Sequence, residues 1–157
     1  IESLHCGKAT AVGAATGAVV GLVTITPAAG FVTPMGAMAM GAIGASVSFL
    51  VIQVFSRFNL DDSLDVFACH GMGGITGALL TGVFASEAVG GSKGLLYGNA
   101  GLMWPQLEAV LAAAGLAGLA TAIILYGLKF TIGLRPTEDD ERFGLDVTEH
   151  AEEAYRR

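Results

Sequence analysis

Residues 66–75 of the chain read VFACHGMGGI and open a run of 21 residues, 66–86, that contains no Asp, Glu, Lys or Arg. A bilayer has a hydrocarbon core about 30 Å thick, which about 20 helical residues can cross. The run is therefore long enough to form a membrane-spanning helix. His70 lies inside it, and a titratable side chain in an apolar span is costly to keep there, which makes His70 a candidate functional residue.

The composition of the whole chain indicates a helical membrane protein. Of its 157 residues, 53% are hydrophobic and 14% are charged, whereas charged residues make up about 25% of a typical soluble domain. The chain also contains 23 glycines. Transmembrane helices accept glycine because small residues let neighbouring helices pack closely. We therefore expect an all-α integral membrane protein.

The charge-free stretches outline four spans. No charged residue occurs from 9 to 56, and residues 26–34, TPAAGFVTP, contain two prolines and a glycine that place a turn in the middle of this stretch. The predicted spans are 9–26, 35–56, 64–86 and 107–132. We expect residues 1–133 to form a transmembrane domain and residues 134–157 to form a cytoplasmic tail.

The positions of the charged residues predict the orientation. Four spans put both ends of the chain on one side, and seven of the eight cations fall on that side, with only Lys93 on the other. By the positive-inside rule, both ends should be cytoplasmic. The tail holds eight of the fourteen acidic residues, and the chain has no basic patch that would indicate a nucleic-acid partner.

His70 has three possible uses when only the residues are considered. It can hydrogen-bond another helix, ligate haem or a metal ion, or line a pore. A metal site needs further donors, but His5 and His150 lie outside the spans and Cys69 lies on a different helical face. A neutral imidazole both donates and accepts a hydrogen bond, which suits a pore for a small hydride such as ammonia or water. The structural and pore-lining uses both remain open at this point.

Three carboxylates precede this histidine. Asp61 or Asp62 can cap the helix, and Asp65 is expected in its first turn, where carboxylates suit the positive end of the helix dipole. Because apolar residues follow Asp65 directly, a partner inside the bundle is the alternative. The chain has no nucleophile–base pair, metal cluster or phosphate-binding loop, so we expect no enzymatic activity, no cofactor and no metal.

Residues 61–77, DDSLDVFACHGMGGITG, closely resemble the late-helix signature of the ammonium transporters, the Amt/MEP/Rh family. Further matching stretches follow the family's order, and the tail favours the Amt branch; these stretches are 7–10 (GKAT), 24–30 (TITPAAG), 133–135 (GLR) and 144–155 (GLDVTEHAEEAY). The resemblance covers nearly the whole chain. It implies that the four spans are the last four helices of an eleven-helix protomer.

The resemblance also implies a function and an assembly. The family removes a proton from ammonium and passes ammonia through a narrow apolar pore, usually in a homotrimer of the plasma (cell inner) membrane with a role in nitrogen metabolism. His70 matches the second of two pore histidines, Val66 and Val19 match apolar pore-wall positions, and Thr26 matches a position near the outer end of its helix. Asp62 and Asp65 would be structural residues near the pore.

Other parts of the family's machinery have no counterpart in this sequence. The first histidine, the phenylalanine gate and the outer recruitment site belong to earlier helices. The chain starts at Ile1 without a methionine, so we expect a fragment that is inactive alone. The alternative to transport is an ammonium sensor or signalling scaffold that acts through the cytoplasmic tail.

The resemblance implies that the tail is a folded regulatory arm, whereas its composition alone also fits a solvated, disordered acidic segment. The family's cytoplasmic face receives PII-type signalling proteins, and Thr148 aligns with a regulatory phosphosite of plant relatives. Ala151 replaces a glycine that is common in the tail motif, so the local turn can differ. The residues assigned to the arm are Gly144, Asp146, Thr148, His150 and Tyr155.

Overall fold

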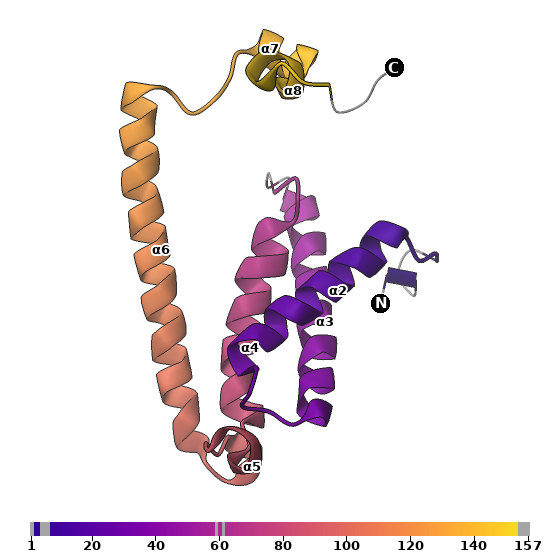
Figure 1. The fold of residues 1–157 in the computed structure, drawn as a ribbon, viewed down its shortest axis with the longest axis vertical. Coiled ribbons are helices and arrows are strands. Elements are labelled where there is room, and N and C mark those ends of the chain that lie inside the picture. Colours follow the sequence, from indigo (N-terminus) through magenta and orange to yellow (C-terminus); the bar gives the residue numbers. More distant parts are fainter. Residues whose placement is uncertain (1, 4–6, 59, 61, 154–157) are drawn as a thin grey trace. The chain divides into compact units, whose positions relative to one another are not determined.

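The computed structural model describes residues 2–3, 7–58, 60 and 62–153, and most of them are helical (Figure 1). Contacts divide the chain into two compact units, Ile1–Ala112 and Ala113–Arg157. Within the described residues, extended pairing is limited to an isolated antiparallel bridge between Val32 and Ala85. The predicted all-α fold is confirmed.

Three helices pack together in the first unit (Figure 1): α2 (Ala11–Ile25), α3 (Pro34–Phe58) and α4 (Met72–Phe84). The Thr10 side chain caps α2 by accepting a hydrogen bond from the Gly13 N–H at 2.9 Å. A short 3-10 turn, η1 (Thr26–Ala28), follows α2, and Gly30 has a φ of +83° that redirects the chain toward α3. The turn predicted within residues 26–34 is confirmed.

A π-helical turn, η2 (Phe67–Gly71), precedes α4. Both carboxylate oxygens of Asp62 accept hydrogen bonds, from the N–H groups of Val66 and Phe67, each at 2.8 Å. The predicted cap is therefore Asp62, and Asp61 lies outside the described residues. The expectation that Asp65 lies in the first turn is wrong. Asp65 precedes the helix with a φ of +52°, because the Asp62 cap makes the helix begin at Val66.

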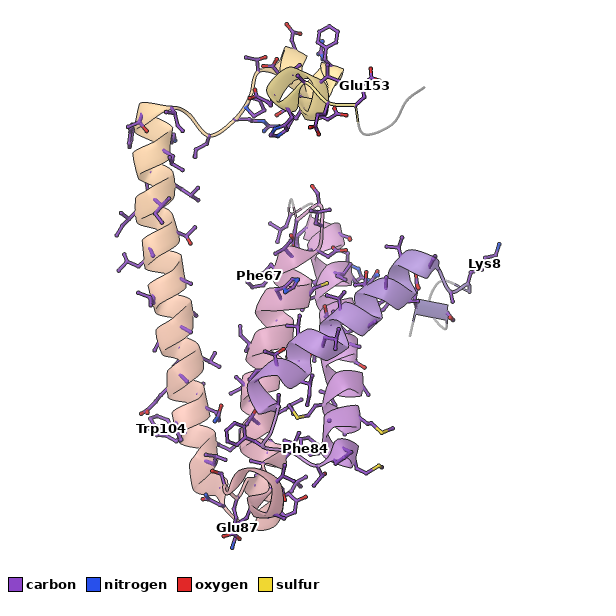
Figure 2. The ribbon with its side chains drawn as sticks, viewed as in Figure 1. Lys8, Phe67, Phe84, Glu87, Trp104 and Glu153 are labelled. Atoms are coloured by element: carbon purple, nitrogen blue, oxygen red, sulfur yellow. The ribbon has the colours of Figure 1, made fainter. Side chains whose placement is uncertain are left out.

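Short elements connect α4 to the fourth long helix: α5 (Glu87–Gly90), η3 (Leu95–Tyr97) and η4 (Ala100–Leu102). The Ser86 N–H donates to the Phe31 carbonyl at 2.8 Å, and the Lys93 ammonium pairs with the Glu87 carboxylate at 2.9 Å. Figure 2 shows Phe84, Glu87 and Trp104 at the same end of this unit, while Phe67 lies toward the other end of the α4 segment.

Helix α6 (Met103–Thr131) starts four residues before the predicted span. Pro105 lies in its first turn, where the missing N–H of proline costs no hydrogen bond. Among the described residues, four helical segments can cross a membrane by length and composition: Ala11–Ala28, Pro34–Phe58, Phe67–Phe84 and Ala100–Thr131. The four predicted spans are confirmed, with ends that shift by a few residues.

Thr24 lies where α2, α3 and α4 meet. It is fully buried, and a Cβ atom built on Gly44 would overlap its side chain, while one built on Gly77 would overlap its backbone carbonyl. Only glycine allows the helix backbones to approach this closely. The glycine at position 77 therefore lets α4 approach the α2 backbone closely.

The second unit contains two short helices beyond α6, α7 (Glu138–Phe143) and α8 (Leu145–His150). Thr137 and Asp140 form a reciprocal capping box at the start of α7. The Arg135 guanidinium donates to the Glu141 carboxylate at 2.7 Å. The boundary between a membrane domain and a tail at residues 133 and 134 stays a prediction.

Candidate functional site: the turn that carries His70

His70 lies in the π-helical turn η2, outside the regular α-helical register. The Met72 N–H donates to the Phe67 carbonyl, five residues back, instead of to the carbonyl four residues back. Single π-turns are rare in proteins, and those that occur are frequently found at functional sites. The third span therefore departs from ideal helix geometry at the residue that the sequence marks as functional.

Two contacts from α3 hold this turn in place. The Ser48 hydroxyl donates to the Ala68 carbonyl at 2.7 Å, and Ser48 is only 1% exposed. The Phe55 ring stacks on the Phe67 ring, with 5.4 Å between centroids and 8° between planes. One contact is polar and the other apolar, and both join α3 to η2.

The turn has a buried side and an exposed side. Ala68 and Cys69 are buried, whereas His70 is exposed in the described part of the chain. Val66, one turn before His70, is 51% exposed. The π-turn therefore packs Ala68 and Cys69 inward and presents His70, together with Val66, away from the packed core.

Val19 lies in α2, a helix that contacts both α4 and the turn η2. The nearest contact between α2 and α4 in this region involves Val23, because a Cβ atom built on Gly73 would lie 3.2 Å from the Val23 side chain. Val19, one turn before Val23, is 43% exposed. The structure therefore places Val66 and His70 one turn apart on the same segment, and the predicted place of Val19 beside them stays a prediction.

Thr26 is separate from this group. It lies in η1, two turns beyond Val19, and its hydroxyl donates to the Leu22 carbonyl of its own helix at 2.7 Å. The hydroxyl is therefore directed back onto the backbone. Its predicted place near the outer end of the path stays a prediction.

A cavity of about 440 Å³ lies beside the turn, between α2 and α3. Its lining includes Ser48, Gln53 and Asp65, and its other walls are mainly small residues of α2. His70 does not line it. The cavity and the exposed face that carries His70 are therefore two different features of the first unit.

The described residues that were assigned to the regulatory arm lie in and next to the short helix α8. The Thr148 hydroxyl donates to the Gly144 carbonyl at 3.3 Å, and the Glu152 N–H donates to the Asp146 carbonyl at 2.9 Å. Gly144 has a φ of +106°, and Ala151 has a φ of +53° just after α8. The turn therefore adopts left-handed backbone at residue 151 even though alanine stands there. His150 ends α8, and Tyr155 lies outside the described residues.

The sequence reasoning missed Ser48 and the π-turn. Ser48 lies in the long apolar helix α3, and a buried hydroxyl is costly unless it finds a hydrogen-bond partner. That cost signals that a buried Ser48 has a hydrogen-bond acceptor, but it does not distinguish an acceptor in its own helix from one in a neighbouring helix. The position of the π-turn has no comparable signal, because hydrophobic periodicity does not distinguish one irregular turn within an apolar run.

Four apolar helical segments of the described residues are long enough to cross a bilayer, and glycines let three of them, α2, α3 and α4, pack closely; these features define a multi-pass membrane protein. More specifically, the chain belongs to the Ammonium Transporter Family, whose model matches residues 1–155. The resemblance stated from residues 61–77 is confirmed.

Curated and structural relatives agree with this family. An "Ammonium transporter" of Aquifex aeolicus is 50% identical over 98% of this chain and 36% of its own length. The "Ammonium transporter" of Bacillus subtilis is 44% identical over 99% of this chain and 39% of its own length. The crystal structure of Saccharomyces cerevisiae Mep2 matches with a TM-score of 0.81 at 32% identity, covering 88% of this chain and 33% of that one. The chain thus spans little more than a third of the length of these relatives.

Proposed function

We propose that this chain forms part of an ammonium transporter in which His70 lines the path of ammonia. The observation that carries the proposal is that His70 is exposed on the π-turn while its neighbours Ala68 and Cys69 are buried. Val19 and Val66 flank it with apolar surface. Because the relatives are named transporters, we propose transport in preference to sensing through the tail.

The chemistry of such a path follows from its lining. A permanent cation is poorly held by apolar walls that offer neither carboxylates nor a ring of carbonyl oxygens. Ammonium therefore has to lose its proton before it passes Val19 and Val66. A neutral imidazole at His70 can accept a hydrogen bond from ammonia with one nitrogen and donate one with the other, which replaces part of the hydration that ammonia gives up.

The complete path requires protein that this chain does not contain. The exposed face that carries His70 needs an opposite wall, and we propose that the remaining helices of an eleven-helix protomer supply it, including a second histidine. The chain would then be inactive alone. Further parts of this proposal are a homotrimer, a plasma-membrane location and two cytoplasmic ends, and a cytoplasmic face that binds a PII-type protein beside α7 and α8.

The first experiment asks whether the chain supports transport. A chimeric transporter is made in which this chain replaces the matching 36% of the Aquifex aeolicus relative, and uptake of labelled methylammonium is measured per copy in the membrane. We expect uptake by the chimera. A chimera that reaches the membrane at the level of the Aquifex parent but takes up none would contradict the proposed function.

The second experiment asks whether His70 contributes. His70→Ala in the chimeric transporter removes a hydrogen-bonding group from the path, which costs about 1–2 kcal/mol and slows uptake about tenfold. The control is Met38→Ala, which also truncates an exposed side chain of a span, but on α3 away from the π-turn. We expect the control to retain the uptake of the unaltered chimera.

A further inference from the structure

We propose that Ser48 is a positioning residue for His70: its hydroxyl stabilises the π-helical turn that sets the direction of the imidazole. This inference rests on the proposed function, because it assigns Ser48 a role in the same path. It goes beyond that function by naming a residue on another helix, 22 positions away in the sequence, that controls where His70 points.

The hydrogen bonds of the turn show why a donor is needed. In an α-helix, the Ala68 carbonyl would accept from the Met72 N–H. In this structure the Met72 N–H donates to the Phe67 carbonyl instead, so the Ala68 carbonyl loses its usual partner. A carbonyl without a partner in apolar surroundings is costly. The Ser48 hydroxyl supplies the replacement donor at 2.7 Å.

A second serine on the same helix shows that this contact is specific. Ser46 also lies in α3, but its hydroxyl donates to the Ala42 carbonyl, four residues back in its own helix, at 2.8 Å. That is the ordinary way for a helical serine to satisfy its hydroxyl. Ser48 instead donates across to η2, and it does so from a fully packed position. Ser48 therefore stabilises the turn, whereas Ser46 serves only its own helix.

The direction of His70 depends on this turn. An α-helix rotates about 100° per residue, so a return of η2 to α-helical register would rotate His70 relative to α4 by an angle of that order. On the proposed path, Val19 and Val66 flank His70 in the π-helical register. Without the Ser48 donor, the α-helical register regains the bond between the Met72 N–H and the Ala68 carbonyl and becomes the favoured one. His70 would then point away from the path.

The stacked pair Phe55 and Phe67 holds η2 against α3 but does not set the helical register of the turn. The register therefore depends on the hydrogen bond from Ser48. Aromatic stacking at 5.4 Å fixes the distance between α3 and η2 but leaves backbone donors and acceptors unchanged. The two contacts therefore have separable effects. Loss of the hydroxyl should change the register of η2 while the ring stack keeps the turn against α3.

The test compares Ser48→Ala with the matched control Ser46→Ala in the chimeric transporter. We expect Ser48→Ala to reduce methylammonium uptake per copy about as much as His70→Ala does, and Ser46→Ala to leave it unchanged. In the His70→Ala background, Ser48→Ala should cause no further loss, because its effect acts through the imidazole. Two independent, multiplicative losses would overturn the inference.

A second readout does not depend on transport. The ¹⁵N signal of the His70 imidazole, assigned by its absence in His70→Ala, should shift in Ser48→Ala and keep its position in Ser46→Ala. An unshifted signal in Ser48→Ala would overturn the positioning role and leave the proposed function intact. If His70→Ala transports normally, the proposed function fails, while the ¹⁵N signal still decides whether Ser48 orients the ring.

A third variant covers the case in which Ser48→Ala does not accumulate in the membrane. Ser48→Cys nearly keeps the volume of the side chain but offers only a weak donor. We then expect the same direction of change in uptake and in the ¹⁵N signal, and rescue of both by Ser48→Thr, which restores a hydroxyl. Normal uptake with an unshifted signal in Ser48→Cys would overturn the inference.

Discussion

The Ser48 hydroxyl and the Ala68 carbonyl oxygen lie 2.7 Å apart and join α3 to the π-helical turn before α4. The contact is buried and links residues that are 20 positions apart in the sequence. It places a polar interaction inside the apolar bundle, two residues before His70. The turn that carries His70 is thus in direct contact with a second helix.

Close packing at Thr24 predicts that alanine substitutions at two glycines of α4 have very different effects on the free energy of unfolding. Gly77→Ala would force its methyl group into the Thr24 backbone, so we expect a loss of about 1–3 kcal/mol in the free energy of unfolding. Gly74→Ala is the matched control, because a Cβ atom there meets nothing within 4 Å and alanine favours a helix. Thermal unfolding of the chimeric transporter in detergent measures both. A Gly77→Ala variant as stable as Gly74→Ala would contradict the packing.

The Asp62 cap predicts a graded effect of substitution. Asp62→Ala removes both acceptors for the Val66 and Phe67 N–H groups, and losing a helix cap costs about 1 kcal/mol. Asp62→Asn keeps one acceptor oxygen and should show a smaller loss. Hydrogen exchange at Val66 and Phe67 measures the opening of this end, and equal protection in Asp62→Ala and the unaltered chimera would argue against the cap.

The left-handed backbone at residue 151 predicts that glycine stabilises the tail. Ala151 has a φ of +53°, a conformation that costs a residue with a Cβ about 1 kcal/mol, so Ala151→Gly should slow hydrogen exchange in α8. Glu149→Gly is the comparison within α8 itself, where glycine weakens a helix and exchange should become faster. Faster exchange in Ala151→Gly would show that residue 151 does not adopt the left-handed conformation.

The ion pair of the tail predicts a pH dependence. The hydrogen bond from Arg135, with its charge, holds the pKa of the Glu141 carboxyl below its ordinary value of 4.5. Because the folded pKa is the lower one, the stabilisation is present above pH 4.5 and is lost as the pH falls through the folded pKa. Circular dichroism of the helical tail should therefore decrease in this acid range. Glu141→Gln should remove that step, and an identical acid profile in this variant would exclude Glu141 as its source.

The position of Thr148 predicts sensitivity to negative charge. Its hydroxyl lies against the Gly144 carbonyl, between Asp146 and Glu149 in the sequence, so an added charge is repelled by its neighbours. We expect Thr148→Asp to loosen the turn and change methylammonium uptake, and the uncharged Thr148→Asn to have a smaller effect. Unchanged uptake in Thr148→Asp would count against a regulatory role.

The four helices were predictable because long apolar runs and proline positions carry that information directly. The start of the third span was less predictable, because the composition allows either Asp61 or Asp62 as the cap and places Asp65 in the first turn. Only the hydrogen bonds from the Val66 and Phe67 N–H groups identify Asp62 as a cap. His70 was identified as a candidate functional residue because a titratable side chain is costly to keep in an apolar span. Its exposure was not predictable, because it arises from an irregular turn that has no sequence pattern and that Ser48, a residue of another helix, contacts.

The decisive measurement is methylammonium uptake per copy in the chimeric transporter, compared between His70→Ala and Met38→Ala, together with selectivity against potassium. If His70 lines the path, uptake falls about tenfold in His70→Ala or its selectivity changes, while Met38→Ala behaves as the unaltered chimera. Uptake by His70→Ala at the same rate and with the same selectivity as the unaltered chimera would contradict the role of His70.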